Sequence, residues 1–293
     1  MSIPFDPHPL LQDYAHPERL VSASWLSARL GTPGLRVVES DEDALLYDIG
    51  HLPGAVRIHW KRDLNSPLQR DFIQPEEFAK LMESKGIGPD DTVVIYGDKS
   101  NWWAAYTFWV FCLFGHKDVR LLNGGRDAWM AEERDTSFVV PEYPKTNYPV
   151  PTRNDAPHRA FVQEVLEAIT HSSATLLDAR NANDYAGIVP ENQSHLETLR
   201  HGHIPGALNI PWDKSVYPNS RFRSFTELEQ LYAEIPTSQE TLVYCTFGHM
   251  AAHTWFVLKF LLGRDEVRNY DGSWTEWGNM IRMPIEHGTP AES

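Results

Sequence analysis

The stretch LVYCTFGHMAAH, residues 242–253, places a cysteine between an apolar run and a segment with helical spacing. A β-strand ending at Cys245 would deliver the sulfur to the carboxyl edge of a sheet, where the N-terminus of the next helix faces it. Exposed N–H groups and the helix dipole at such a terminus favour an anion and lower the pKa of a thiol. Gly248 allows a positive φ, so that successive amides can turn inward. These residues predict a nucleophilic thiolate at Cys245, with a plain core cysteine as the alternative.

The elements that must position this loop follow from the apolar pattern. Short apolar runs predict buried strands at 35–40, 92–97, 174–179 and 241–245. Helical spacing with acidic first turns predicts helices at 75–86 and 225–235. Gly263 ends a further apolar run and suits a left-handed helix cap. Strands that alternate with helices favour an α/β fold, a mostly parallel sheet flanked by helices on both faces.

The chain contains one internal duplication. GHLPGAVRIHW begins at Gly50 and GHIPGALNIPW at Gly202, and a second similar pair begins at Thr92 and Glu240. In the second pair a constant offset sets Cys245 opposite Gly97, so only one copy carries the thiol. Residues 141–158 contain five prolines, which forbid a continuous helix or a central strand. We therefore expect a first domain at 1–140, a linker at 141–158 and a second domain at 159–293.

Composition narrows the possible functions. The 293 residues carry 26 Lys and Arg against 40 Asp and Glu, a net charge of −14, which argues against a nucleic-acid partner. No apolar run approaches the roughly 18–20 residues of a membrane span, and no secretory signal is evident, so we expect a cytoplasmic protein. Two cysteines are too few for a disulfide framework, and both are expected to be free thiols. Cys112, among apolar neighbours, is expected to be plain core.

Two long motifs carry a family resemblance. YDIGHLPGAVRI in the first half and VRNYDGSWTEW near the end resemble the two signatures of tandem-domain rhodaneses, sulfurtransferases of the actinobacterial thiosulfate sulfurtransferase type. The resemblance spans essentially the whole chain and includes the single cysteine of the second copy. It implies two rhodanese domains, with Cys245 taking a sulfane sulfur as a persulfide and passing it to cyanide or a thiol. It implies no cofactor, and a monomer is the default expectation.

The persulfide would rest among the backbone amides of the loop. The residues expected to bind it are Thr246, Phe247, Gly248, His249, Met250 and Ala251. Preorganised donors of this kind are often the largest contribution to catalysis. Isolated histidines show no cluster with ligand spacing, so a metal site is not expected.

The loop departs from both common patterns of the family. Members that use thiosulfate commonly carry a basic residue just after the cysteine, and members that use 3-mercaptopyruvate tend to have a small Gly-Ser-Gly loop. CTFGHM has neither. His249 is the only titratable side chain of the loop, and when protonated it could hold an anionic donor, so transfer should fall as pH rises past neutrality. Thiosulfate is the preferred donor on overall resemblance, and 3-mercaptopyruvate is the alternative.

Other candidates lie outside the loop. Some family members place a substrate-binding arginine where this chain has Asp184. Arg180 and Trp274 are possible site residues, although Arg180 is expected first as an ion-pair partner, in a network with Asp178. An anionic sulfur donor could also bind to the two arginines of the segment NSRFRS, Arg221 and Arg223.

Two rival functions remain. A phosphatase class on this fold uses the loop C-x-x-x-x-x-R, in which arginine binds phosphate bidentately. The sixth residue after Cys245 is Ala251, and no arginine follows before Arg264, which excludes that pattern. A non-enzymatic binding module is the other rival. The first half resembles one, because Gly97-Asp98 stands where the thiol would be.

Overall fold

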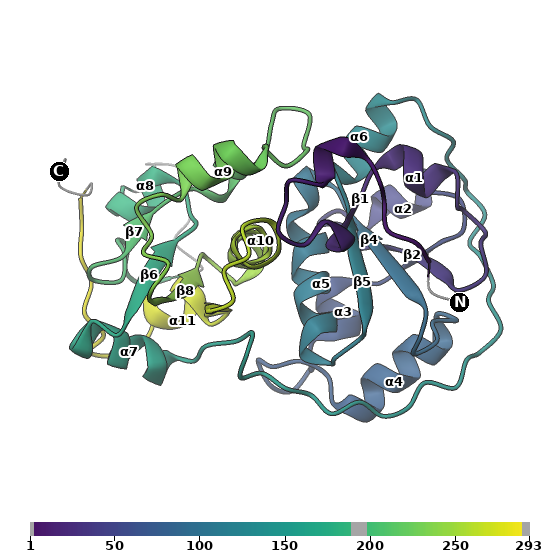
Figure 1. Cartoon of the computed structure of the whole chain (residues 1–293). Helices are drawn as coiled ribbons and strands as arrows, with labels where there is room; N and C mark the ends of the chain where they lie inside the picture. The colour runs from purple at the N-terminus through teal and green to yellow at the C-terminus, as the bar shows by residue number, and fades with distance from the viewer. Residues whose placement is uncertain (1–2, 189–197, 289–293) are drawn as a thin grey trace. The chain divides into compact units, whose positions relative to one another are not determined.

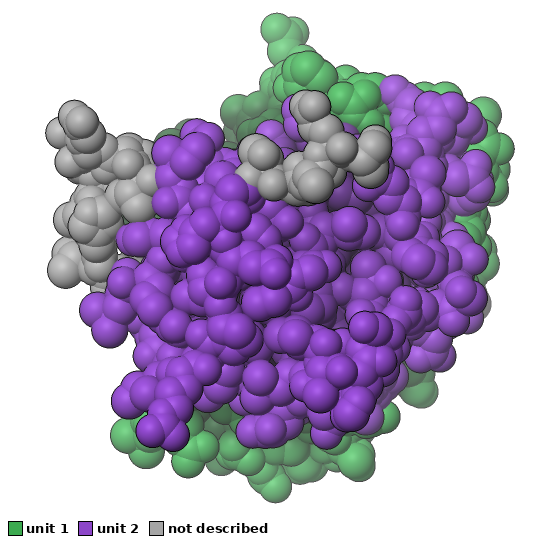
Figure 2. All heavy atoms as spheres, turned by 90° about the vertical axis from the view of Figure 1, so that its left-hand side faces the viewer, with its two compact units in different colours: residues 1–154, 216–224 green, residues 155–215, 225–293 purple. Residues whose placement is uncertain are grey.

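The computed structural model describes residues 3–188 and 198–288 and divides the chain into two compact units (Figure 2). Unit 1 comprises residues 1–154 and 216–224, and unit 2 comprises residues 155–215 and 225–293. The boundary differs from the predicted one, because residues 141–154 pack on unit 1. Tyr143 Oη donates to Gly54 O at 2.8 Å, and Thr146 Oγ1 donates to Ile87 O at 2.6 Å.

Unit 1 is built on a five-stranded parallel sheet in the order β1-β5-β4-β2-β3 (Figure 1). Its strands are β1 (Leu20–Val21), β2 (Leu35–Glu39), β3 (Ala55–Arg57), β4 (Thr92–Tyr96) and β5 (Asp118–Leu122). Its α-helices are α1 (Ala23–Ser27), α2 (Leu45–Asp48), α3 (Trp60–Leu64), α4 (Pro75–Ser84), α5 (Trp102–Leu113) and α6 (Gly125–Ala131). Short 3₁₀ helices lie at Pro9–Leu11, Pro17–Arg19 and Lys99–Asn101.

Helices cover both faces of this sheet because alternate strand residues point to opposite sides. Val37 and Val94 pack in one cluster with Trp25 of α1 and Trp129 of α6. Neighbouring residues such as Ile95 are also fully buried, on the face that α5 covers. Figure 1 shows α5 and α1 on opposite sides of the sheet.

Unit 2 repeats the plan with a four-stranded parallel sheet in the order β7-β6-β8-β9. Its strands are β6 (Ala174–Asp178), β7 (Leu208–Asn209), β8 (Glu240–Tyr244) and β9 (Val267–Asn269). Its α-helices are α7 (Val162–His171), α8 (Ala182–Ala186), α9 (Phe225–Leu231), α10 (His249–Phe256) and α11 (Ser273–Trp277). A 3₁₀ helix lies at Trp212–Ser215, and a π-helical turn at Val257–Leu261 continues α10. Side chains of α7, α8 and α11 pack with Leu176, Leu242 and Tyr244 on one face, and α10 packs on β8 and β9.

The predicted strands and helices are confirmed, with ends shifted by a few residues. Gly263 adopts φ +69°, as the predicted left-handed cap requires. Cys112 was predicted to be a buried core residue, but it lies on α5 with part of its surface exposed. The parallel sheets bring the ends of β4 and β8 to the carboxyl edges of their sheets, where the loops carrying Gly97 and Cys245 begin.

Candidate active site

Cys245 directly follows β8, and α10 begins four residues later at His249. Gly248 precedes the helix with φ +96°, a conformation that side chains other than glycine's rarely adopt. A Cβ atom there would lie 2.7 Å from Cβ of Asp271, so the loop also lacks room for a side chain. The turn from strand to helix therefore depends on glycine at this position.

The loop turns backbone amides toward the sulfur, as predicted for a loop of this kind. Gly248 N lies 3.1 Å from Cys245 Sγ, and hydrogen bonds from the N–H groups of Ala251, Phe247, Gly248 and Met250 favour the thiolate. Cys245 has no exposed surface. Burial consequently raises the pKa of the Cys245 thiol above its ordinary value, and the four amides offset only part of that rise. The expected lowering of the pKa is wrong, because the full burial of the sulfur outweighs the amides.

Two residues of α11 hold the backbone of Cys245. Cys245 N donates to Ser273 Oγ at 3.1 Å, and Trp274 N donates to Cys245 O at 2.9 Å. Ser273 Oγ in turn donates to Tyr270 O at 2.8 Å. Ser273 is fully buried with φ +55°, a left-handed conformation that is strained for a non-glycine residue. Sequence reasoning missed this residue, although the internal repeat sets it opposite Gly125, and glycine in one copy is a signal of positive φ.

A second set of contacts supports the loop from β9 and the segment after it. Asn269 Nδ2 donates to Gly248 O at 3.0 Å. Asp271, the residue that crowds Gly248, accepts two hydrogen bonds from Arg159, at 2.7 and 3.0 Å. Both charges of this pair are largely buried, so removal of either would leave the other uncompensated. The loop geometry therefore rests on a rigid framework.

His249 does not supply the positive charge that the sequence suggested. Its side chain is buried at the start of α10, and burial lowers the pKa of His249 to about 3. The imidazole is therefore neutral at pH 7, and the expected fall of activity past neutrality has no basis in this residue. The ring of Phe247 stacks on that of His249 with centroids 5.9 Å apart, and 38% of Phe247 is exposed.

Arg180 has the structural role that was expected first. It is buried, pairs with Asp178 at 2.5 Å and donates to Gly202 O at 2.8 Å. Its guanidinium lies 4.6 Å from the ring centroid of Trp274, whose indole N–H donates to Arg200 O at 3.0 Å. These contacts direct Arg180 and the Trp274 ring into the core of unit 2.

Arg221 and Arg223 belong to unit 1, whereas Cys245 belongs to unit 2. Arg221 is ion-paired with Glu132, and Arg223 lies 5.1 Å from the ring centroid of Tyr217. Each guanidinium thus has a partner within unit 1.

The corresponding loop of unit 1 is filled by its own side chains. Asn101 Oδ1 accepts a hydrogen bond from Gly97 N at 2.9 Å, and Asn101 Nδ2 donates to Leu122 O at 2.6 Å. A Cβ atom on Gly97 would clash with the carbonyl oxygen of Ser40. Unit 1 therefore has no room for a cysteine where unit 2 has Cys245.

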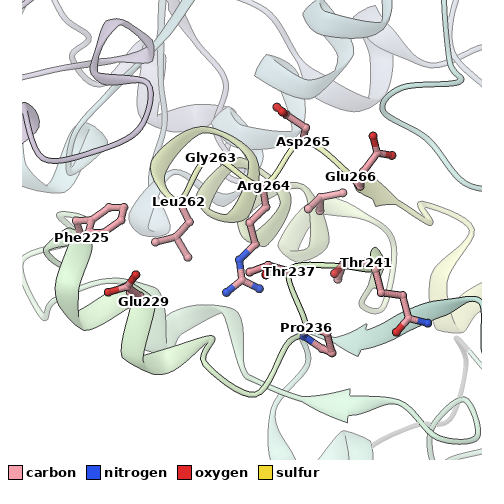
Figure 3. Close-up of a pocket in the computed structure, with 12 residues that line it drawn as sticks. Phe225, Glu229, Pro236, Thr237, Thr241, Leu262, Gly263, Arg264, Asp265 and Glu266 are labelled. Atoms are coloured by element: carbon pink, nitrogen blue, oxygen red, sulfur yellow. The ribbon is translucent and has the colours of Figure 1, made fainter.

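A hollow in unit 2 lies away from Cys245. It has a volume of about 430 Å³ and is lined by Thr241 and Val267 at the starts of β8 and β9, together with Arg264 (Figure 3). This edge of the sheet is opposite to the edge where Cys245 lies. Within residues 3–188 and 198–288, no cluster of His, Cys, Asp or Glu could hold a metal ion. No helix in the same ranges is long and apolar enough to cross a membrane.

The model of the rhodanese-like domain matches the chain twice, at residues 22–132 and 161–280. The chain belongs to the rhodanese family. Rhodanese relatives include the thiosulfate sulfurtransferase of Corynebacterium glutamicum, 65% identical over 98% of this chain and 97% of that protein. A putative thiosulfate sulfurtransferase of Mycobacterium tuberculosis is 58% identical over 98% of this chain and 97% of its own length.

A solved rhodanese-fold structure extends the comparison. The crystal structure of a 3-mercaptopyruvate sulfotransferase from Escherichia coli matches with a TM-score of 0.76 at 26% identity. The match covers 87% of this chain and 98% of that one. The Corynebacterium and Mycobacterium relatives agree with the actinobacterial type that the two signature motifs indicated.

Proposed function

We propose that this rhodanese is a thiosulfate sulfurtransferase that carries the sulfane sulfur as a persulfide on Cys245. The observation that carries the proposal is the loop in which four N–H groups favour negative charge on a cysteine sulfur. A relative 65% identical over nearly the whole chain bears the name thiosulfate sulfurtransferase. The filled loop of unit 1 restricts this chemistry to unit 2.

In the first step the Cys245 thiolate attacks the outer sulfur of thiosulfate. A new S–S bond forms, the S–S bond of thiosulfate breaks, and sulfite leaves with the electron pair. The thiol proton goes to solvent before the attack. Because the thiol is fully buried, the side chains that cover it must move aside before a donor can reach the sulfur.

In the second step cyanide or a thiol attacks the terminal sulfur of the persulfide. The S–S bond breaks and the Cys245 thiolate returns as the leaving group. Splitting the transfer into two displacements is the general advantage of nucleophilic catalysis. The amides of Phe247, Gly248, Met250 and Ala251 stabilise the negative sulfur before and after each displacement. No net oxidation occurs, and no group beyond the chain is needed for either step.

Two donors are to be compared. Neutral His249 leaves the loop without a cationic side chain, so thiosulfate would be held by amides rather than by a charged group. If thiosulfate is the donor, kcat/KM should be higher for thiosulfate. If 3-mercaptopyruvate is the donor instead, kcat/KM should be higher for 3-mercaptopyruvate. Both free thiols suit a reducing compartment, so we place the enzyme in the cytoplasm, and we expect a monomer that light scattering would verify.

Thiocyanate formation tests the proposal. The parent protein is supplied with cyanide and with either thiosulfate or 3-mercaptopyruvate, and kcat/KM is measured for both. We expect a higher kcat/KM for thiosulfate and no turnover by Cys245→Ser with either donor. Cys112→Ser is the matched control and should keep the parent activity. A higher kcat/KM for 3-mercaptopyruvate would overturn the donor, and turnover by Cys245→Ser would overturn the role of this residue.

A further inference from the structure

Unit 1 carries a hollow of about 280 Å³ lined in part by three cationic side chains. Arg57 comes from the end of β3, Arg62 from α3, and Lys85 from the residue after α4. Val140 and Pro141 also line it. We call this hollow the basic pocket. Three cations around one hollow stand out in a chain with 26 Lys and Arg against 40 Asp and Glu.

Two of the three cations form ion pairs with carboxylates, and the third forms none within the described part of the chain. Arg57 pairs with Asp48 at 3.2 Å, and Arg62 pairs with Asp63 at 2.9 Å. Over residues 3–188 and 198–288, the Lys85 ammonium makes no ion pair or hydrogen bond. Burial lowers the pKa of Lys85. The carboxylate of Asp63 raises this pKa, whereas the positive charges of Arg62 and Arg57 lower it further. The basic pocket thus holds a half-buried ammonium beside two other positive charges.

The internal repeat provides a comparison for one of these cations. In the sheet of unit 1, Arg57 is in register with Glu39, which is itself in register with Tyr96. The same place in unit 2 is Asn209, in register with Asp178. The fold itself therefore does not require an arginine at the end of this strand.

Two aromatic rings, of Tyr47 and Tyr143, also line the basic pocket, together with Asp48, Ser84 and Val56. The Tyr47 and Tyr143 hydroxyls already donate to Ala55 O and Gly54 O, both within 2.8 Å. Because both hydroxyl hydrogens are already used, the two tyrosines would contact a ligand through the faces of their rings. The Arg57 guanidinium lies 5.1 Å from the ring centroid of Tyr47. Sites for small molecules commonly combine apolar walls with a few convergent polar groups.

We propose that the basic pocket binds a small organic anion that carries a phosphate or sulfate group. Lys85, Arg57 and Arg62 hold the oxyanion, since guanidinium and ammonium groups are the usual partners of such groups in proteins. The organic part lies against the two tyrosine rings. An oxyanion would pair directly with the Lys85 ammonium, which among the described residues has the attraction of Asp63 but no ion pair. This site belongs to unit 1 and is independent of sulfur transfer at Cys245.

Calorimetric titration with phenyl phosphate tests the site, with phenol and potassium chloride of equal ionic strength as references. The variants are Lys85→Gln, Arg62→Gln and the control Lys80→Gln, which removes an exposed lysine of α4. We expect the parent and Lys80→Gln to bind phenyl phosphate with equal Kd. Lys85→Gln and Arg62→Gln should each bind it at least about tenfold more weakly, the usual effect of losing a charge-assisted hydrogen bond. Phenol should not bind.

Thermal unfolding without added anion supplies a second readout. Removing the Lys85 charge removes the cost of burying it and its repulsion from Arg62 and Arg57, at the loss of the attraction of Asp63, so Lys85→Gln should melt at the same temperature as the parent or above it. Phenyl phosphate should raise the melting temperature of the parent and of Lys80→Gln only. The site does not exist if the parent fails to bind phenyl phosphate, or if both Lys85→Gln and Arg62→Gln bind it as tightly as Lys80→Gln.

Discussion

The hydrogen bond from Cys245 N to Ser273 Oγ leads to a prediction in which stability and activity separate. Ser273 holds the cysteine backbone from a left-handed conformation, with φ +55°. Ser273→Ala removes the acceptor and keeps the strain. Ser273→Gly removes the same acceptor and relieves the strain, because glycine adopts positive φ readily.

The magnitudes follow from these contacts. Either variant leaves the buried Cys245 N–H without its acceptor, which costs about 1–3 kcal/mol of unfolding free energy. A non-glycine residue in the left-handed conformation costs about 1–2 kcal/mol, and Ser273→Gly recovers this cost. Glycine also gives the unfolded chain greater freedom, which takes back about 0.4–1 kcal/mol. Ser273→Gly should therefore be more stable than Ser273→Ala by up to about 1.5 kcal/mol. Both should lose activity alike, about tenfold in kcat/KM if the bond contributes about 1.4 kcal/mol to holding the sulfur in place.

Urea unfolding and steady-state thiocyanate formation measure the two quantities on the same preparations. A kcat/KM in Ser273→Ala equal to that of the parent would show that the bond only stabilises the fold. Equal unfolding free energies for the alanine and glycine variants would refute the assignment of strain to Ser273.

Three further predictions concern residues whose roles the structure revised or defined. The pKa of His249 is about 3 in the folded chain, against an ordinary value of 6.5. Between pH 3 and pH 6.5 the unfolded chain therefore binds a proton at His249 that the folded chain does not bind, so the free energy of unfolding rises with pH in this range. His249→Asn should flatten that rise in urea midpoints and leave the pH profile of kcat/KM from about pH 6 to 8.5 unchanged; a changed profile would return His249 to the mechanism. Gly97→Cys should lower the unfolding free energy, by about 1–3 kcal/mol from overpacking against Ser40, and add no activity to a Cys245→Ser background; thiocyanate formation by that double variant would contradict the account of unit 1. Arg180→Met should cost about 3–5 kcal/mol of stability by leaving Asp178 buried without its partner, with KM for thiosulfate unchanged in the folded protein; a raised KM would instead place Arg180 at the substrate.

Much of the architecture could be predicted from the chain because local pattern decides it. Buried strands are short and apolar, and the internal repeat by itself sets Cys245 opposite Gly97. Gly248 could be assigned a positive φ, because a strand that turns into a helix over so few residues needs one. These features depend on neighbours in the sequence, which are visible.

The remaining features depend on what each group meets in three dimensions. His249 looked titratable near neutrality, but burial keeps it neutral. Burial likewise raises the pKa of the Cys245 thiol, although loop amides hydrogen-bond to its sulfur. The membership of residues 216–224 in unit 1 follows from contacts such as the one between Ser220 and Asp127, at 2.7 Å, which no local pattern encodes.

Mass spectrometry of peptides from thiosulfate-treated protein tests the central claim most directly. The account predicts one added sulfur atom on the peptide that contains Cys245, its removal by cyanide, and no added sulfur on the peptide that contains Cys112. Added sulfur on Cys112 alone, or an unmodified Cys245 in protein that is turning over thiosulfate, would contradict the claim that this loop carries the transferred sulfur.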